Sequence, residues 1–479
     1  MITNRTTQRW TLALTSIAFL MVALDALVVA TALPAIQRDI HAGLTTLEWT
    51  VNAYALTFAA AMITAAGLGD RFGRRRVFAA GLAMFTTASA ACALAPNAEL
   101  LLAARAIQGL GAAAVMTLSL TILTEAFPPE RRGAVVGLWG AIGGLAVASG
   151  PVIGGAITQG IDWHWIFWVN VPIGLAAIPL SRARLTESRG SRSPLDLPGL
   201  ALSAAGATAL VYGLTRAGTG GFTSTAALAT LGAAALLIIG FVANERRAEH
   251  PMLPPRLFAN RTFSAANASA FLMTGAIMSA AFLIAQYFQF ARHASPLTTG
   301  LELLPWTVTP TLIAPLAGAL SDRIGPRPLI ATGLALQAAG LAWFAALAAS
   351  ATQAPRYGAL IGPLVLAGVG ISMALPTTPA AALGAVNPED LGKASGTNST
   401  LQRFGGAFGV AVATAVFAAH GHIGTSASFT AGFGPALATA AILSAIGAGA
   451  ALLVARRPSV GRSDAVNVAV EALEPEPVV

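Results

Sequence analysis

Charged residues and cysteine are scarce in this sequence. Asp, Glu, Lys and Arg make up 10% of the 479 residues, whereas hydrophobic residues make up 55% and the mean hydropathy is +0.70. Because charged residues make up about 25% of an ordinary soluble domain, this composition excludes a soluble globular protein. The single cysteine, Cys92, excludes an internal disulfide bond and a cysteine-based metal site. We expect neither a metal ion nor a cofactor.

Long apolar runs make up most of the chain. About 20 residues of helix cross a hydrocarbon core of about 30 Å, and a backbone exposed to lipid must satisfy its own hydrogen bonds, which favours helices. We therefore predict an all-α, polytopic membrane protein with fourteen transmembrane helices. The predicted spans are 11–33, 49–69, 77–94, 99–124, 133–159, 164–181, 197–215, 223–243, 262–290, 299–320, 328–349, 357–383, 396–419 and 430–455.

The positive charges are unevenly distributed among the loops. The net charge is +8, and 22 of the 28 Lys and Arg residues fall in loops on the same side as the N-terminus, whereas four fall on the opposite side. This bias follows the positive-inside rule and predicts a multi-pass protein of the cytoplasmic membrane with both termini in the cytoplasm. Topology explains the positive charge, so no nucleic-acid partner is expected.

A short basic turn occurs twice between apolar runs. It reads Asp70-Arg71-Phe72-Gly73-Arg74 and, 252 residues later, Asp322-Arg323-Ile324-Gly325-Pro326. At an offset of 259, Gly109 pairs with Gly368 in the same order. Two motifs that recur in order at half-chain spacing indicate a duplicated membrane unit, an architecture typical of carriers with a central site.

The repeat predicts how the chain is divided. Spans 1–6 and 9–14 form two pseudo-symmetric halves, and spans 7 and 8 are inserted between them as a hairpin. The predicted units are the N-terminal half at 1–190, the hairpin at 191–248, the C-terminal half at 249–457 and a disordered cytoplasmic tail at 458–479. The halves differ, because Leu364 replaces Arg105 and Val410 replaces Pro151 in the second half.

Three charged residues fall at a similar depth within the predicted spans. Asp25 and Arg105 lie about 8–9 Å below the outer boundary of the hydrocarbon core, and Glu302 is predicted near the same level. Charges at such a depth are costly and mark functional sites by default. We interpret Asp25 as a titrating carboxylate next to Arg105, with Gln108 one turn away holding the guanidinium. The alternatives are a structural ion pair between spans 1 and 4 and, for Glu302, simple exposure to solvent.

Span 5 is rich in glycine. Gly150 and Gly154 recur four residues apart, which permits close helix contact. Pro151 removes a backbone hydrogen bond and is expected to bend the helix. Such a helix is suited either to close packing or to a rocking surface beside a cavity.

Together these motifs resemble the major facilitator superfamily, and more closely its fourteen-helix drug:proton antiporter subfamily. The loop 2–3 motif is Ala66-Gly67-Leu68-Gly69-Asp70-Arg71-Phe72-Gly73-Arg74-Arg75. The helix 4 motif is Arg105-Ala106-Ile107-Gln108-Gly109-Leu110-Gly111. Further similar segments are Leu24-Asp25-Ala26-Leu27-Val28-Val29, Gly137 with Gly150-Pro151 and Gly154-Gly155, and Trp163-His164-Trp165-Ile166-Phe167 with Asn170-Val171-Pro172. The resemblance covers essentially the whole chain.

The resemblance implies a proton-driven efflux antiporter that exports lipophilic drugs, antibiotics or dyes from a bacterium. It would act as a monomer and use the proton gradient in place of a cofactor. Asp70 would contact the start of span 13 near Gly396 and stabilise the outward-facing state. The implied roles are proton coupling at Asp25, Arg105 and Gln108, gating at Asp70, Arg71, Gly73, Arg74, Asp322, Arg323 and Gly325, and the antiporter helix at Gly137, Gly150, Pro151, Gly154 and Gly155.

Polar side chains within apolar spans are candidates for a substrate cavity. Arg403 has an alternative interpretation, in which it extends to the membrane interface. A carrier of one metabolite or self-made natural product is the alternative function, and an integral membrane enzyme or a channel fits the residues less well. The cavity candidates are Asn52, Tyr54, Gln286, Gln289, Glu302 and Arg403.

Overall fold

The computed structural model describes the chain at residues 5–41, 43–190, 196–221, 223–249, 251, 253–350, 355–387, 390–423 and 425–455. The predicted disordered tail at 458–479 lies outside these ranges. Within them the regular structure is helical throughout, without a strand. The helices are α1 (Arg5–Asp39), α2 (Leu44–Phe72), α3 (Arg74–Ala93), α4 (Ala98–Ala126), α5 (Pro129–Gly160), α6 (Trp165–Trp168), α7 (Asn170–Arg184), α8 (Leu197–Gly220), α9 (Thr225–Arg247), α10 (Pro255–Phe258), α11 (Arg261–Phe290), α12 (Pro296–Glu302), α13 (Leu304–Thr307), α14 (Thr309–Ile324), α15 (Pro326–Ser350), α16 (Tyr357–Leu383), α17 (Leu391–His420) and α18 (Ser426–Ala451).

The prediction of an all-helical membrane protein is confirmed. Eleven helices in the described part of the chain are long and apolar enough to cross a membrane, and the count reaches 13 if each of two bent helix pairs forms one span. The number fourteen therefore stays a prediction. One predicted span is not a continuous helix, because 299–320 is divided into α12, α13 and α14. The span predicted at 164–181 corresponds to α6 and α7, which together form one candidate span, Trp165–Arg184.

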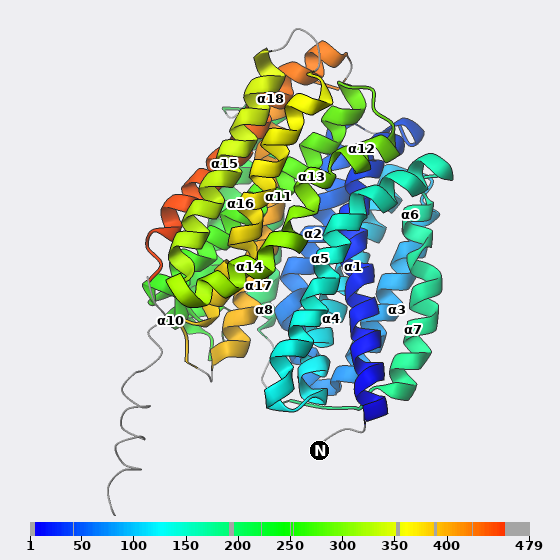
Figure 1. The fold of residues 1–479 in the computed structure, drawn as a ribbon, viewed down its shortest axis with the longest axis vertical. Coiled ribbons are helices and arrows are strands. Elements are labelled where there is room, and N and C mark those ends of the chain that lie inside the picture. The colour runs from blue at the N-terminus through cyan, green and yellow to red at the C-terminus, as the bar shows by residue number, and fades with distance from the viewer. Residues whose placement is uncertain are drawn as a thin grey trace, which may run out of the picture.

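The helices form two groups that lie side by side (Figure 1). In one group α1 packs on α5, and α4 packs on both α2 and α3. In the other, α11 packs on α17 and α18, and α15 packs on α16 and α18. Between the groups, α8 contacts α9, α17 and α2. We call the first group, α1–α7, the N-half and the second, α10–α18, the C-half; their boundaries as domains stay a prediction.

Glycines that the repeat pairs with one another occupy equivalent helix crossings. A Cβ atom added to Gly111 on α4 would lie 2.6 Å from the backbone nitrogen of Phe85 on α3. One added to Gly370 on α16 would lie 2.9 Å from Cα of Gln337 on α15. Both positions need glycine because two backbones approach closely there, so the α3–α4 crossing has its counterpart in the α15–α16 crossing.

The two ends of the bundle differ in their turns. The proximal end is where α1 begins, and it contains the α2–α3 turn at Gly73 and the α14–α15 turn at Gly325. These glycines have φ values of 108° and 85°, which residues other than glycine rarely adopt. The repeated motif thus forms two equivalent tight turns. The distal end is where α1 finishes at Asp39.

Besides the packing of α2 on α17, the halves meet at the distal end. There α5 lies against α12, and a Cβ added at Gly155 would lie 2.8 Å from Cα of Leu297. The backbone nitrogen of Leu297 also donates to Oε1 of Gln159 at 3.1 Å. Nε2 of Gln289 on α11 donates to the carbonyl of Thr31 on α1 at 2.8 Å. At the proximal end, no hydrogen bond or ion pair between described residues joins the halves.

Candidate functional site

A buried ion pair joins α1 to α4 within the N-half. Nη1 of Arg105 lies 2.6 Å from Oδ2 of Asp25, and both side chains are 1% exposed. The same Nη1 donates to Oε1 of Gln108 at 2.8 Å, and Nε2 of Gln108 donates to Oδ1 of Asp25 at 2.9 Å. The structure therefore brings the three residues that we predicted for proton coupling into one closed set of hydrogen bonds.

A fourth member of this network comes from α7. Nδ2 of Asn170 donates to Oδ1 of Asp25 at 3.1 Å and to Oγ of Ser89 at 3.1 Å. Ser89 on α3 in turn donates to the carbonyl of Phe167 at 2.9 Å. In the sequence Asn170 stands out only as part of a motif, and nothing there indicates this contact. One carboxylate thereby receives donors from α4 and α7.

The Arg105 guanidinium is held on its other sides by α2. Its Nε donates to the carbonyl of Thr50 at 3.1 Å, and its Cζ lies 4.2 Å from the centre of the Tyr54 ring. The Phe167 ring centre lies 5.7 Å away. A guanidinium with five donors suits such multiple contacts, which a lysine ammonium does not reproduce.

The arrangement couples the charge of Asp25 to helix positions. A buried charge is tolerated when it is paired and hydrogen bonded, and here the donors come from two helices other than that of the acid. The Asp25 carboxylate therefore links α1 to α4 through Arg105 and Gln108, and to α7 through Asn170.

The predicted gate at the α2–α3 turn forms contacts within its own half. Oδ1 of Asp70 accepts from Nε of Arg74 at 2.9 Å, and Arg74 also pairs with Glu125 at the end of α4. The expected contact of Asp70 with α17 near Gly396 is absent among the described residues, and the carboxylate contacts Arg74 instead. Arg71 is exposed, and its Cζ lies 5.5 Å from the Phe72 ring centre.

The second copy of the turn is described less fully. Gly325 caps α14, and Arg323 is exposed without an ion pair to another described residue. The side chain of Asp322 lies outside the described part of the chain. In the first copy, Arg75 and Arg76 lie near Glu187 after α7, with N–O distances of 3.6 and 3.5 Å.

The glycines of α5 contact both α1 and α12. A Cβ added to Gly150 would lie 2.9 Å from Cβ of Leu27, and one added to Gly154 would lie 2.8 Å from the carbonyl of Val28. The predicted close packing of α5 is thus confirmed. On the other side of α5, the backbone of Pro151 meets Gly300 of α12, and Gly155 meets Pro296. Gly137 lies in the part of α5 whose side chains are outside the described set.

The cavity candidates do not form one cluster. Tyr54 lies under Arg105, and Asn52 is bonded to Glu48 at 3.3 Å. Gln286 donates to the carbonyl of Phe282 within α11. Cζ of Arg403 on α17 lies 4.3 Å from the centre of the Phe58 ring on α2, between the halves.

Glu302 is not part of the Asp25 network. Its Oε1 pairs with Nη2 of Arg292 at 3.2 Å, and its backbone carbonyl accepts from the Tyr357 hydroxyl at 3.2 Å. The side chain is only 12% exposed, so the alternative of simple solvent exposure is wrong as well. Glu302 lies near the distal end, as its position along the predicted span indicates, but that position gives no indication of Arg292 as its partner.

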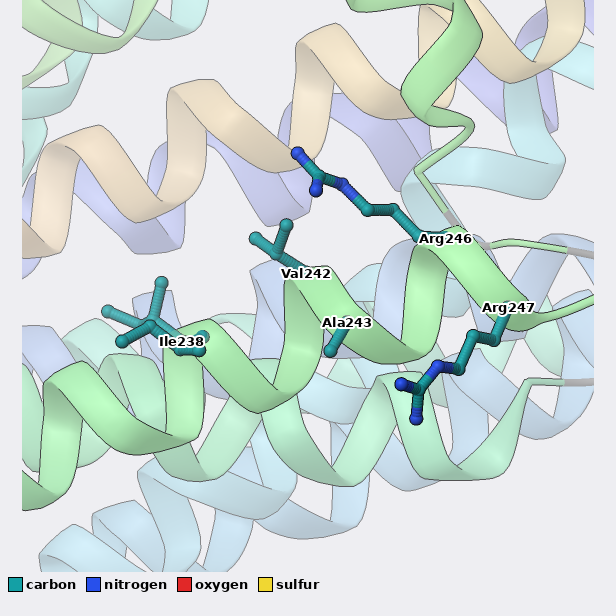
Figure 2. Close-up of a pocket in the computed structure, with 6 residues that line it drawn as sticks. Ile238, Val242, Ala243, Arg246 and Arg247 are labelled. Carbon is teal, nitrogen blue, oxygen red and sulfur yellow. The ribbon is translucent and has the colours of Figure 1, made fainter.

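A groove on the outer side of α9 lies apart from this network. It has a volume of about 380 Å³ and is lined by Ile238, Ile239, Val242, Ala243, Arg246 and Arg247. Figure 2 shows the apolar side chains along α9 and the two arginines at its end. This groove does not include any of the predicted site residues.

Comparison with known proteins places the chain among membrane carriers. The family described as Major Facilitator Superfamily matches residues 15–260 and 263–475. The tetracenomycin C resistance and export protein of Streptomyces glaucescens is 34% identical over 404 residues, which cover 84% of this chain and 74% of the relative. The multidrug resistance protein Stp of Mycobacterium tuberculosis is 37% identical over 420 residues, covering 87% and 77%. The puromycin resistance protein of Streptomyces alboniger is 34% identical over 415 residues, covering 85% and 81%.

Solved structures with the same fold are more distant in sequence. A bacterial homologue of the human lysosomal transporter Spinster, inward-facing and occupied, has a TM-score of 0.68 at 14% identity and covers 94% of this chain and 97% of its own. A peptide transporter in complex with sulfate has a TM-score of 0.66 at 16% identity, covering 93% and 95%. At these identities the likeness concerns the fold alone.

Proposed function

The chain belongs to the major facilitator superfamily of membrane transporters, and we propose that it is a proton-driven antiporter that exports lipophilic drugs, antibiotics or dyes by alternating access. The hydrogen-bonded pair of Asp25 and Arg105 is the observation that carries this proposal. A carboxylate shielded from solvent, aimed at donors on two other helices, has the properties of a coupling site. The names of the relatives, which are resistance and export proteins, support efflux as the direction of transport.

The proton couples to the gate through α5. Because α1 carries Asp25 and packs on Gly150 and Gly154, a change in how α1 is held moves the surface on which α5 rests. The opposite side of α5 forms the distal contact with α12. Protonation at Asp25 and opening at the distal end are thereby linked through two adjoining helix contacts.

The positive-inside bias assigns the proximal end to the cytoplasm. With this orientation the protein is closed on the outside, where α5 meets α12, and the cytoplasmic ends of the halves are not bridged between described residues. In the opposite state Asp70 exchanges Arg74 for the start of α17. A carboxylate at a helix N-terminus gains about 0.3–1 kcal/mol, which suits a gate that must also open.

The charge of the substrate determines which part of the proton gradient drives its export. One charge that crosses 100 mV contributes about 2.3 kcal/mol, and each tenfold concentration gradient costs about 1.4 kcal/mol. Exchange of one proton for one monovalent cation moves no net charge, so only the pH gradient drives it. A neutral substrate uses the membrane potential and the pH gradient together.

Efflux in a bacterial strain that lacks its own drug pumps tests the proposal. The wild-type protein is expected to raise resistance to puromycin or to lower ethidium accumulation, and Asp25→Asn at equal membrane level is expected to abolish the effect. Should no lipophilic drug or dye be exported, a carrier of one metabolite or self-made product is favoured instead. That alternative is supported by the relative named for export of tetracenomycin C.

A further inference from the structure

A second buried carboxyl lies on α2, outside the Asp25 network. Glu48 is 0% exposed although it is only the fifth residue of α2. At 1.5 Å per residue it lies about 6 Å from the distal start of that helix. Its Oε1 contacts Oγ1 of Thr215 on α8 at 2.8 Å and Nδ2 of Asn52 at 3.3 Å. Its Oε2 is buried without a hydrogen-bond partner in the described structure.

The partners of Glu48 are suited to a carboxylic acid. The Thr215 hydroxyl has one proton and lies near two acceptors, Oε1 of Glu48 and the carbonyl of Val211 at 3.0 Å. With the Thr215 proton directed to Val211, the Thr215 oxygen accepts a proton from Glu48. Oδ1 of Asn52, on the other side chain that contacts Glu48, is also buried without a hydrogen-bond partner in the described structure. The unpartnered acceptors Oε2 of Glu48 and Oδ1 of Asn52 indicate that the carboxyl of Glu48 carries a proton.

Charged groups on the helices around α2 do not compensate Glu48. On α4, Arg105 is directed at Asp25 of α1, and on α17, Arg403 lies over Phe58. On α8, Nη2 of Arg216 donates to the Tyr212 hydroxyl. The thiol of Cys92 on α3 donates to Gln108. Between described residues, no cationic nitrogen lies within 4 Å of the Glu48 carboxyl.

We propose that Glu48 is a second proton-binding site. Its carboxylate takes up a proton from the distal side and becomes a carboxylic acid. The site joins the N-half to α8, one helix of the predicted hairpin. Glu48 lies in the same turn of α2 as Thr50, whose backbone carbonyl accepts a hydrogen bond from Nε of Arg105. This inference rests on the proposed antiport and extends it: Asp25 and Glu48 together bind two protons per cycle.

Infrared spectroscopy of the purified protein in lipid tests proton binding at Glu48 without any transport. The wild type is expected to show a carboxylic acid carbonyl band at neutral pH that is lost in Glu48→Gln and kept in Asp25→Asn. Glu99→Gln, at an exposed glutamate near the same distal end, is the matched control and keeps the band. If Glu48→Gln fails to fold, Thr215→Val replaces it, and loss of the hydroxyl contact must shift the band. A spectrum unchanged by Glu48→Gln, or by Thr215→Val in its place, overturns the proposal.

The number of protons per cycle tests the functional consequence. In proteoliposomes, we measure the pH gradient at which a fixed ethidium gradient causes no net transport, and from it calculate the number of protons exchanged per ethidium. The expected ratio is two for wild type and one for Glu48→Gln. An unchanged ratio contradicts the second site, as does a ratio that responds to a sodium gradient. If ethidium is not transported at all, the proposed efflux function fails for this dye, while the infrared result still decides whether Glu48 binds a proton.

Discussion

Asp25 is the residue on which the proposed coupling depends, because three side chains from two other helices donate to it. Arg105 and Gln108 approach from α4, and Asn170 approaches from α7. Loss of one partner from a buried ion pair is costly, since the other charge is left uncompensated. The network is therefore expected to contribute both to the stability of the fold and to the proposed proton coupling. Unfolding experiments measure the first contribution, and transport experiments measure the second.

A double-mutant cycle tests the structural part. Arg105→Met and Asp25→Asn are each expected to lower the free energy of unfolding by about 3–5 kcal/mol, because each leaves one buried group without its partner. The double variant is expected to lose less than the sum of the single losses by about 0.5–3 kcal/mol. Unfolding in detergent, followed by tryptophan fluorescence, measures these values. Additive losses contradict a direct interaction.

Asn170 offers a second test at the level of one residue. Asn170→Ala removes a donor to Asp25 and is expected to cost about 1.5–3 kcal/mol, the range of a hydrogen bond to a charged group. We also expect the pH dependence of efflux to change, because the carboxylate loses one of its donors. Asn97→Ala, at the exposed N-cap of α4, is the control that lowers stability without altering the pH profile. An unchanged pH profile in Asn170→Ala rules out a positioning role.

Charge and depth made part of this site predictable. Asp25 and Arg105 stood out because ionisable residues are rare inside apolar spans, and Gln108 followed from helical spacing. Asn170 did not stand out, since a neutral polar residue near the end of a span is common. Glu48 was missed because the second span was placed at 49–69, one residue beyond it, whereas α2 begins at Leu44. Apolarity alone locates the middle of a helix better than its end.

Among the helices, α5 is the element that connects the proposed proton site with the proposed distal gate. Its small residues let two backbones approach on opposite sides, with α1 on one side and α12 on the other. Small-residue contacts of this kind pack closely without polar bonds. They also allow a helix to separate again, which a carrier requires.

Substitution of these glycines is expected to shift the conformation. In Gly155→Ala the added methyl group lies 2.8 Å from Cα of Leu297, so the α5–α12 contact loses about 1–3 kcal/mol through overpacking. The distal end is then expected to open more often, and the distance between spin labels on α5 and α12 should increase. Gly160→Ala is the control, because no atom lies within 4 Å of its added Cβ. Equal distances in both variants contradict the assignment of this contact as the distal gate.

The apolar runs in the sequence did not indicate where a transmembrane helix is interrupted. The predicted span 299–320 contains Pro305 and Pro310, and the structure bends by 43° between α12 and the helix that follows. Proline lacks the N–H that continues a helix, so the signal was present in the sequence. Hydropathy averaged over a window does not register this break.

At the scale of the whole molecule, the two halves share their helix crossings but differ in chemistry. Gly111 and Gly370 mark equivalent crossings, yet the position of Arg105 in the N-half corresponds to the buried Leu364 in the C-half. Pro151 corresponds to the buried Val410 in the same way. The duplication thus supplies two similar helical scaffolds, and the buried ion pair on which the proposed proton coupling rests lies in one of them.

Transport by purified protein in proteoliposomes under an imposed pH gradient tests the central claim most directly. Wild type is expected to concentrate an exported drug against its gradient, whereas Asp25→Asn retains downhill exchange but loses uphill transport. This separation follows if Asp25 binds the driving proton and the rest of the carrier remains intact. Uphill transport at the wild-type level by Asp25→Asn would contradict the account.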